Sequence, residues 1–287
     1  MLYSNLILAC AGGPSGDSAL PDSAGDTDLV DSGSSGTDSG DGDSGDTGKV
    51  VRGRPLGLGI PAYAYPSDPA FDAWVAGVDQ AGGVVILNPA SGVGAEKDSY
   101  YSYAVGAVHA AGGTVLGYVS TAYGTTDTDE MYRDIGRYFA WYEVDGIFFD
   151  EVPGAGDTCI TQAEQYEDFA NVAHQERSAI DGERAFIAFN PGTDSCEEYM
   201  ELVDAVVIVE QAGAGIVGWV AQDWVANYPS EQFWLLAHET SAAELPAVLQ
   251  VARDNNIGLV YVTDDVLPNP WDALPTYFDQ LVADIVL

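Results

Sequence analysis

The chain has 287 residues, of which 47% are hydrophobic, enough to form one large buried core or two small ones. It carries 45 acidic residues against 9 basic ones, for a formal charge of -36. This balance excludes nucleic acid and anionic lipid as partners, because both need cationic groups that neutralise phosphates. The acidity suits either a cationic polymer as partner or solubility in a salty habitat.

The N-terminal segment, residues 1–13, is apolar and ends in small residues around Cys10. Residues 7–10, Ile-Leu-Ala-Cys, resemble the lipobox of bacterial lipoproteins, in which the cysteine is acylated. The segment is short and lacks a basic start, so we expect a truncated or atypical lipoprotein signal with Cys10 as the lipid anchor. The protein would then be exported, as a cell-surface or outer-membrane lipoprotein or as a secreted protein, and would meet a membrane only through this anchor.

Residues 14–54 consist almost entirely of Gly, Ser, Asp and Thr. This composition cannot bury apolar surface and its negative charges repel one another, which predicts a disordered linker. Its Asp-x-Asp-Gly spacings suggest calcium loops, but the glutamate that closes an EF-hand loop is absent. We therefore expect a tether followed by one domain over residues 55–287.

Within this domain, short runs of β-branched and aromatic residues alternate with longer segments of helical periodicity, which is typical of parallel β/α architecture. The predicted strands cover residues 58–65, 83–88, 114–120, 145–150, 185–190, 205–210, 233–238 and 257–263. The predicted helices include residues 71–81, 101–111, 129–141, 161–180 and 274–286.

Eight strand-helix pairs in sequence order predict an α/β fold, a closed (β/α)8 TIM-type barrel. A doubly wound sheet is the alternative, but no Gly-x-Gly-x-x-Gly turn follows the first strand. Pro61 is unfavourable inside a central strand, so we expect it near the start of its strand or at a bulge.

Polar residues follow the predicted strands at their C-terminal ends, where barrels of this type carry their chemistry. Tyrosine rings stack on sugars, and amides and carboxylates bind hydroxyl groups, so this ring of side chains suits a polyhydroxylated substrate. The candidate substrate-binding residues are Tyr63, Tyr65, Asn88, Tyr118, Tyr123, Asn190, His238 and Asp264.

Three carboxylates are candidates for catalysis: Asp150 and Glu151 after the fourth strand, and Glu210 at the end of the sixth. Glycoside hydrolysis needs two such groups, and positions two strands apart can face each other across a cleft. Successive side chains of a strand point to opposite faces, so only Asp150 of the adjacent pair is expected to point into the mouth unless the chain has already turned. All three acids could instead solvate loops or cap helices.

Other hydrolase classes find less support in the sequence. His109, His174 and His238 are isolated and form no zinc-binding spacing, so no metal site is expected. The Gly-x-Ser-x-Gly elbow of serine hydrolases is absent. With Cys10 assigned to lipid, Cys159 and Cys196 form either a disulfide between neighbouring loops of an exported protein or two free thiols.

Four motifs stand in order over the first half of the predicted barrel: Ile-Pro-Ala-Tyr-Ala-Tyr-Pro (60–66), Asn-Pro-Ala-Ser-Gly (88–92), Gly-Tyr-Val-Ser-Thr-Ala-Tyr-Gly (117–124) and Asp-Gly-Ile-Phe-Phe-Asp-Glu (145–151). They resemble the spherulin-4-like family (spherulation-specific family 4), and the second half is similar to that family more by pattern than by motif.

The resemblance implies a (β/α)8 glycoside hydrolase whose fungal relatives look like endo-acting α-1,4-N-acetylgalactosaminidases of galactosamine-containing exopolysaccharide. Asp150 and Glu151 match the family's strand-four pair, and Glu210 matches its strand-six glutamate within a weaker flanking sequence. In that interpretation Asp150 is the nucleophile and Glu210 the acid/base of a retaining mechanism, and no cofactor is implied.

The sequence thus predicts an exported endo-glycosidase that acts, as a monomer, on an amino-sugar polysaccharide. The alternative is a non-catalytic cell-surface protein that binds polysaccharide through the tyrosine-lined rim. The sugar, its linkage and the choice between retention and inversion stay open at this stage.

Overall fold

The computed structural model describes residues 56–154 and 156–287, without the side chains of residues 157–161. The predicted signal, the lipid anchor at Cys10, the linker and the side chain of Cys159 lie outside the described residues. The anchor and the Cys159–Cys196 disulfide therefore stay predictions. Among the described helices, none is long and apolar enough to cross a membrane.

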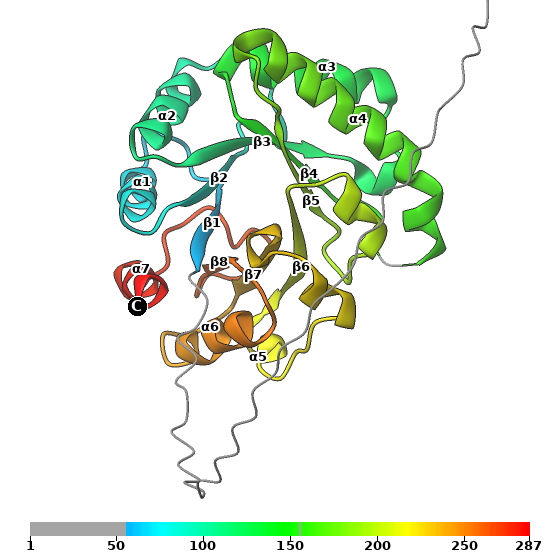
Figure 1. The fold of residues 1–287 in the computed structure, drawn as a ribbon. Helices are drawn as coiled ribbons and strands as arrows, with labels where there is room; N and C mark the ends of the chain where they lie inside the picture. The colour runs from blue at the N-terminus through cyan, green and yellow to red at the C-terminus, as the bar shows by residue number, and fades with distance from the viewer. Residues whose placement is uncertain (1–55, 155) are drawn as a thin grey trace, which may run out of the picture. The chain divides into compact units, whose positions relative to one another are not determined.

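Eight parallel strands close into a barrel in sequence order, β1 to β8 (Figure 1), which confirms the predicted (β/α)8 TIM-type fold. Their bounds are β1 Gly57–Ala62, β2 Gly83–Leu87, β3 Thr114–Ser120, β4 Gly146–Asp150, β5 Phe186–Asn190, β6 Ala205–Ala212, β7 Phe233–His238 and β8 Leu259–Val262. The strands are almost continuously buried, as expected of a parallel sheet that is covered on both faces.

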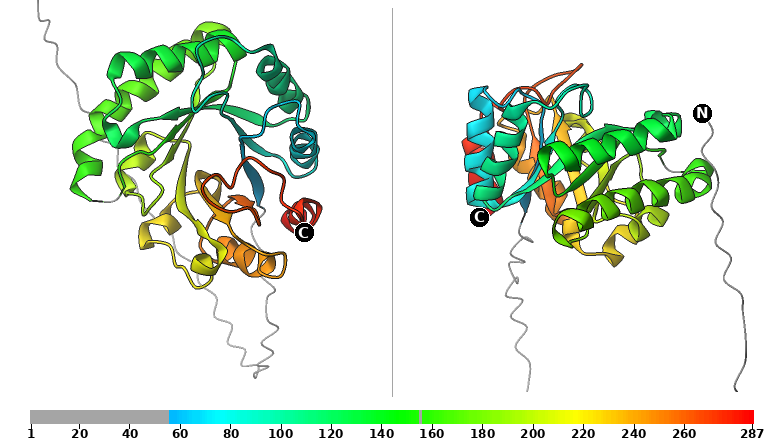
Figure 2. Two further views of the ribbon diagram at one scale, coloured as in Figure 1. Left: turned by 180° about the vertical axis from the view of Figure 1, so that it is seen from behind. Right: turned by 90° about the horizontal axis from the view of Figure 1, so that it is seen from above.

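The helices surround the barrel (Figure 2). Their bounds are α1 Pro69–Ala81, α2 Ser99–Ala110, α3 Thr128–Tyr142, α4 Asp157–Asp181, α5 Gly213–Ile216, α6 Leu245–Asp254 and α7 Phe278–Val286. Asp68, Asp98 and Asp127 cap α1, α2 and α3, each accepting a hydrogen bond from a backbone N–H of the first turn. Part of the chain's acidity is therefore structural, because a carboxylate at a helix N-terminus stabilises the helix.

Aromatic rings fill the inside of the barrel. The indole Nε1–H of Trp234 donates to the carbonyl oxygen of Gly59 at 3.0 Å, and a Cβ at position 59 would lie only 2.1 Å from that nitrogen. Phe148 packs against Trp234 with ring centroids 5.7 Å apart, and Tyr118 stacks on Phe148 at 6.5 Å. This aromatic column forms the floor beneath the C-terminal ends of the strands.

Two predictions about the strands need correction. Pro61 lies in the second half of β1, paired with Ile86, and not near the strand's start. Proline has no N–H to donate, but β1 pairs with β8 only at Gly57 and Leu58. At Pro61 the strand pairs with β2 alone, so the missing hydrogen bond is tolerated.

The second correction concerns the connection from β5 to β6, for which a strand-helix pair was predicted. Residues 191–204 contain only the 3-10 helix Glu197–Glu201. Tyr199 of this segment is fully buried, with its ring 5.1 Å from Phe189 and 6.2 Å from Tyr166. The Tyr199 side chain thus covers the outer face of the barrel beside Phe189, where an α-helix usually packs.

Candidate active site

A pocket of about 230 Å³ opens at the C-terminal ends of β4, β5 and β6. It is lined mostly by polar side chains, and the residues around it are Tyr123, Asp150, Glu151, Asn190, Pro191, Gly192, Glu210 and His238. All three carboxylates expected from the sequence are in this set. The barrel therefore brings the predicted catalytic residues together at one site.

Asn190, the last residue of β5, joins the two principal carboxylates. Its Nδ2 donates to Asp150 Oδ1 at 2.9 Å and to Glu210 Oε2 at 2.7 Å. Its Oδ1 accepts a hydrogen bond from the backbone N–H of Gly192 at 2.9 Å. These three contacts use both donors and the acceptor of the amide, so the amide's orientation and both carboxylates are held in place.

Asp150 has a second donor. The hydroxyl of Tyr118 donates to Asp150 Oδ2 at 2.8 Å, and the ring of Tyr63 contacts that of Tyr118 edge to face at 5.6 Å. Burial and the nearby Asp150 charge raise the pKa of Tyr63 well above its ordinary value. Both phenols therefore stay protonated, and that of Tyr118 remains a donor to Asp150.

The two carboxylates differ in the number of hydrogen-bond donors that stabilise their charged forms. Burial raises the pKa of Glu210 to about 7, the bond from Asn190 opposes this, and the negative charge of Asp150 adds to it. Burial also raises the pKa of Asp150, but hydrogen bonds from Tyr118 and Asn190 counteract the increase. Because Asp150 receives one side-chain donor more than Glu210, Asp150 is the better anion and Glu210 the better acid.

Glu151 also reaches the pocket, contrary to the expectation from strand parity. Its backbone is left-handed, with φ at 55°, so the chain has already turned after β4. The hydroxyl of Ser120 donates to Glu151 Oε2 at 2.5 Å, and Thr121 Oγ1 donates to its backbone carbonyl at 2.7 Å. A non-glycine residue in this conformation stores strain that the surrounding contacts must offset, as is common at functional sites.

A β-bulge lies two residues before Glu210. Pairing between β6 and β7 shifts register between Val207 and Val209, leaving Ile208 as the extra residue. The strand then continues to Ala212, two residues past its predicted end. The bulge interrupts the alternation of side chains, so the direction of Glu210 depends on it.

The other predicted site residues divide into two groups. Tyr123 and His238 line the pocket. The His238 ring is 6.3 Å from that of Trp271, and its Nδ1 lies 3.3 Å from Glu239 Oε1 without hydrogen-bond geometry. His238 Nδ1 is thus a buried nitrogen without a hydrogen-bond partner among the described residues, at the edge of the pocket that the His238 ring lines.

The second group is engaged in loops outside the pocket lining. Asn88 Oδ1 accepts from the backbone N–H of Gly92 at 2.7 Å, and Asp264 accepts from the backbone N–H of Thr276 at 3.0 Å. Tyr65 hydrogen-bonds Asp98. Their predicted contact with substrate has no support in the pocket's lining.

Ser120 and Trp271 are site neighbours that were not among the predicted residues. Ser120 ends β3 within the third sequence motif, so its position at a strand end was an available signal. Trp271 lies in the segment after β8, far from any strand end, and no local pattern indicated its contact with His238.

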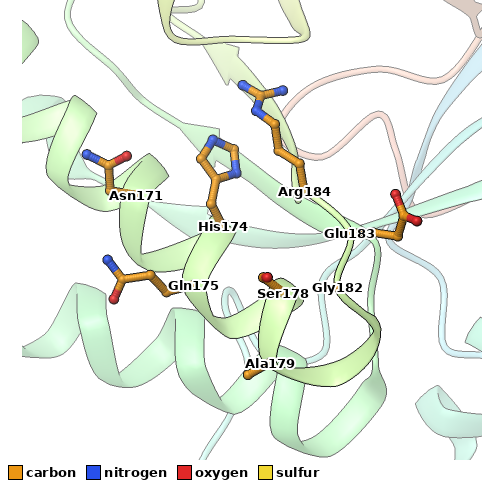
Figure 3. Close-up of a pocket in the computed structure, with 8 residues that line it drawn as sticks. All are labelled: Asn171, His174, Gln175, Ser178, Ala179, Gly182, Glu183 and Arg184. Atoms are coloured by element: carbon orange, nitrogen blue, oxygen red, sulfur yellow. The ribbon is translucent and has the colours of Figure 1, made fainter.

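A larger pocket, of about 620 Å³, lies between the C-terminal part of α4 and the segment entering β5 (Figure 3). Figure 3 shows Asn171, His174 and Ser178 on the helix beside Arg184. Arg184 Nη1 is 2.6 Å from Asp204 Oδ1, and burial and the Arg184 charge lower the pKa of His174. This pocket is at the strands' N-terminal end and has no carboxylate pair, so it is not the candidate active site.

Within residues 56–154 and 156–287, no group of three His, Cys, Asp or Glu side chains is placed to hold a metal ion.

The chain is similar in sequence and in fold to known proteins. It is 30% identical to Spherulin-4 of Physarum polycephalum over 240 residues, which cover 79% of this chain and 69% of that protein. The crystal structure of Aspergillus clavatus Sph3 in complex with GalNAc superimposes with a TM-score of 0.68 at 21% identity, covering 81% of this chain and 98% of that one.

A more distant likeness is to the spore cortex-lytic enzyme SleL of Bacillus cereus, with a TM-score of 0.52 and 8% identity over 82% of this chain and 75% of that one. These two structures share the barrel fold with this chain. The family described as Spherulation-specific family 4 matches residues 58–285, from the second residue of β1 through β8 and most of α7. The chain therefore belongs to spherulation-specific family 4.

Proposed function

We propose that this chain is a glycoside hydrolase that cleaves an amino-sugar exopolysaccharide at internal linkages of the α-1,4-N-acetylgalactosamine type. The observation that carries the proposal is the pair formed by Asp150 and Glu210 on the single amide nitrogen of Asn190. One carboxylate is biased toward the anion and the other toward the acid, which is the division of roles that glycoside hydrolysis requires.

The proposed reaction has two steps. Glu210 donates its proton to the glycosidic oxygen while an oxygen of Asp150 attacks the anomeric carbon, which breaks the glycosidic bond and forms a glycosyl ester. Glu210, now ionised, then takes a proton from a water molecule, and that water displaces Asp150 from the anomeric carbon. The sugar leaves with a new reducing end, and both carboxyl groups return to their starting states.

The short separation of the pair favours this retaining course. Both hydrogen bonds start at Asn190 Nδ2, with lengths of 2.9 and 2.7 Å, so Asp150 Oδ1 and Glu210 Oε2 lie less than about 6 Å apart. Retaining enzymes place their carboxyl groups about 5 to 5.5 Å apart, whereas inverting enzymes need about 6.5 to 9.5 Å to admit water.

Two observations support an amino-sugar substrate: a similar structure and the negative charge of this chain. Sph3, whose barrel resembles this one, is described in complex with GalNAc. A chain with a formal charge of -36 also attracts a polymer whose sugars carry free ammonium groups. Both arguments point to a galactosamine polymer that is partly acetylated.

The test uses Asp150→Asn and Glu210→Gln beside the wild type, with release of reducing ends from partly acetylated α-1,4-galactosamine polymer as the measurement. We expect each variant to lose at least a hundredfold in rate, because general acid catalysis alone contributes about 10²- to 10⁴-fold. Glu198→Gln, which changes an exposed glutamate of the β5–β6 connection, is the matched control.

A wild-type protein that binds the polymer but releases no reducing ends would refute the enzyme and favour a polysaccharide-binding protein. Cleavage by Asp150→Asn at the wild-type rate would remove Asp150 from the mechanism.

A further inference from the structure

Three tyrosines outside the carboxylate pocket present their rings to solvent. Tyr65 is 43% exposed, Tyr100 53% and Tyr103 67%. Tyr100 and Tyr103 stand three residues apart on α2 and so share one face of that helix. We call Tyr65, Tyr100 and Tyr103 the tyrosine platform. Large exposed aromatic groups that cluster in this way commonly mark a binding surface.

Hydrogen bonds and ring contacts hold Tyr65 against the start of α2. The Tyr65 hydroxyl donates to Asp98 Oδ2 at 2.8 Å, and Asp98 Oδ1 accepts from the backbone N–H of Tyr100 at 2.9 Å while capping α2. The Tyr65 ring lies 5.4 Å from that of Tyr100 and stands edge to face with buried Tyr101 at 5.8 Å. The fixed ring of Tyr65 supports that of Tyr100, so a ligand that stacks on Tyr100 would lose less binding energy to ordering that side chain.

A hollow of about 470 Å³ lies beside the rings, and it combines apolar and polar groups. Pro66, Tyr100 and Tyr103 supply the apolar surface, and Ser67, Asp72 and Ser99 supply two hydroxyls and a carboxylate. Flat rings beside hydroxyl and carboxylate groups match the faces and edges of a pyranose. The carboxylate of Asp72 can accept from sugar hydroxyls or from the ammonium of a free amino sugar.

The platform and the carboxylates belong to the same end of the barrel. Tyr65 follows β1, and Tyr100 opens the helix that follows β2, so both lie toward the C-terminal ends of the strands. In the closed strand order β1 lies opposite β5, and Figure 1 shows β1 and β2 across the barrel from β5 and β6.

Two further tyrosines lie next to the catalytic pair. Tyr63, two residues before Tyr65, contacts the ring of Tyr118, whose hydroxyl binds Asp150. An extended polymer that enters the pocket can therefore continue along the same end of the barrel toward the platform. A single sugar bound at the catalytic pair would not reach the platform.

We propose that the tyrosine platform is a second carbohydrate-binding site, which holds distal pyranose units of the same amino-sugar polysaccharide by stacking on Tyr100 and Tyr103. This proposal rests on the proposed function, which supplies the identity of the polymer. It adds a site that increases affinity for long chains and keeps the enzyme on its substrate.

The test measures binding of partly acetylated α-1,4-galactosamine polymer by affinity gel electrophoresis, in the Asp150→Asn background so that the polymer stays intact. In this background the double change Tyr100→Ala and Tyr103→Ala should weaken binding by about 5- to 10-fold, since each ring contact contributes a modest amount. Tyr100→Phe with Tyr103→Phe keeps both rings and should retain the affinity of the parent. Val220→Ala, which truncates another exposed apolar side chain, controls for loss of apolar surface.

Equal affinity of the alanine variant and its parent would overturn the second site, as would failure of the parent to bind the polymer. A concentration-dependent dimer in sedimentation that the alanine changes abolish, with polymer binding unaffected, would make the platform a contact between copies and also overturn it. The cleavage assay on the wild type is independent, so loss of binding in the alanine variant beside an inactive wild type would support the site while refuting the enzyme.

Discussion

Replacing Glu210 by glutamine is expected to stabilise the protein in alkaline solution. Burial raises the pKa of Glu210 from its ordinary value of 4.5 to about 7. Between these two pH values the folded protein holds a proton that the unfolded chain has released, so the free energy of unfolding falls as pH rises. At about 1.4 kcal/mol per pH unit, the loss amounts to roughly 3 kcal/mol once the pH is above 7.

Glutamine avoids this loss because it is neutral at every pH, and its Oε1 can still accept the bond from Asn190. Urea unfolding at pH 4 and pH 8, followed by the fluorescence of the 6 tryptophans, measures the difference. We expect Glu210→Gln to match the wild type at pH 4 and to exceed it by about 3 kcal/mol at pH 8. Glu198→Gln removes an exposed carboxylate and should show no such gain. A Glu210→Gln protein no more stable than the wild type at pH 8 would refute the pKa assigned to the buried acid.

Three further predictions concern the rate. If protonated Glu210 is the general acid, kcat/KM should fall about tenfold per pH unit above pH 7, and a profile flat to pH 9 would contradict that role. Asn190→Ala removes the hydrogen bond that lowers the pKa of Glu210, so the alkaline limb of the pH profile should move to higher pH. Like Asn190, Asn88 accepts a hydrogen bond from the backbone N–H of a nearby glycine, but it lies away from the carboxylates. Asn88→Ala should therefore leave both limbs of the pH profile in place. Tyr118→Phe removes a hydrogen-bond donor that lowers the pKa of Asp150, so the acid limb of the pH profile should move to higher pH and kcat should fall. An unchanged acid limb would show that ionisation of Asp150 does not determine that limb.

The strands could be read from the sequence because each is a short apolar run that ends in polar or turn residues. β3 and β7 coincide with their predicted bounds, since hydrophobic burial determines where a parallel strand begins and ends. The prediction failed at Pro61 and in the connection after β5, where the outcome depends on which neighbouring strand still pairs and on which side chain fills the wall.

The gathering of Asp150, Glu151 and Glu210 could also be predicted, because the C-terminal ends of barrel strands share one rim. The family resemblance implied their roles, but local sequence did not reveal how Glu151 and Glu210 are oriented. The parity argument favoured Asp150 over Glu151 for the mouth unless the chain had already turned, and the left-handed backbone of Glu151 shows that it has. The orientation of Glu210 follows from a bulge in β6 that has no local sequence signature.

The sequence by itself thus determined the barrel, its family and the set of acids at its mouth, since periodic burial and strand order are properties of the chain. Only the tertiary structure decided that Asn190 joins Asp150 to Glu210 and that Tyr118 donates to Asp150 alone. These contacts join residues on different strands, and the balance between burial and hydrogen-bond donors that acts on each pKa exists only when the strands are assembled.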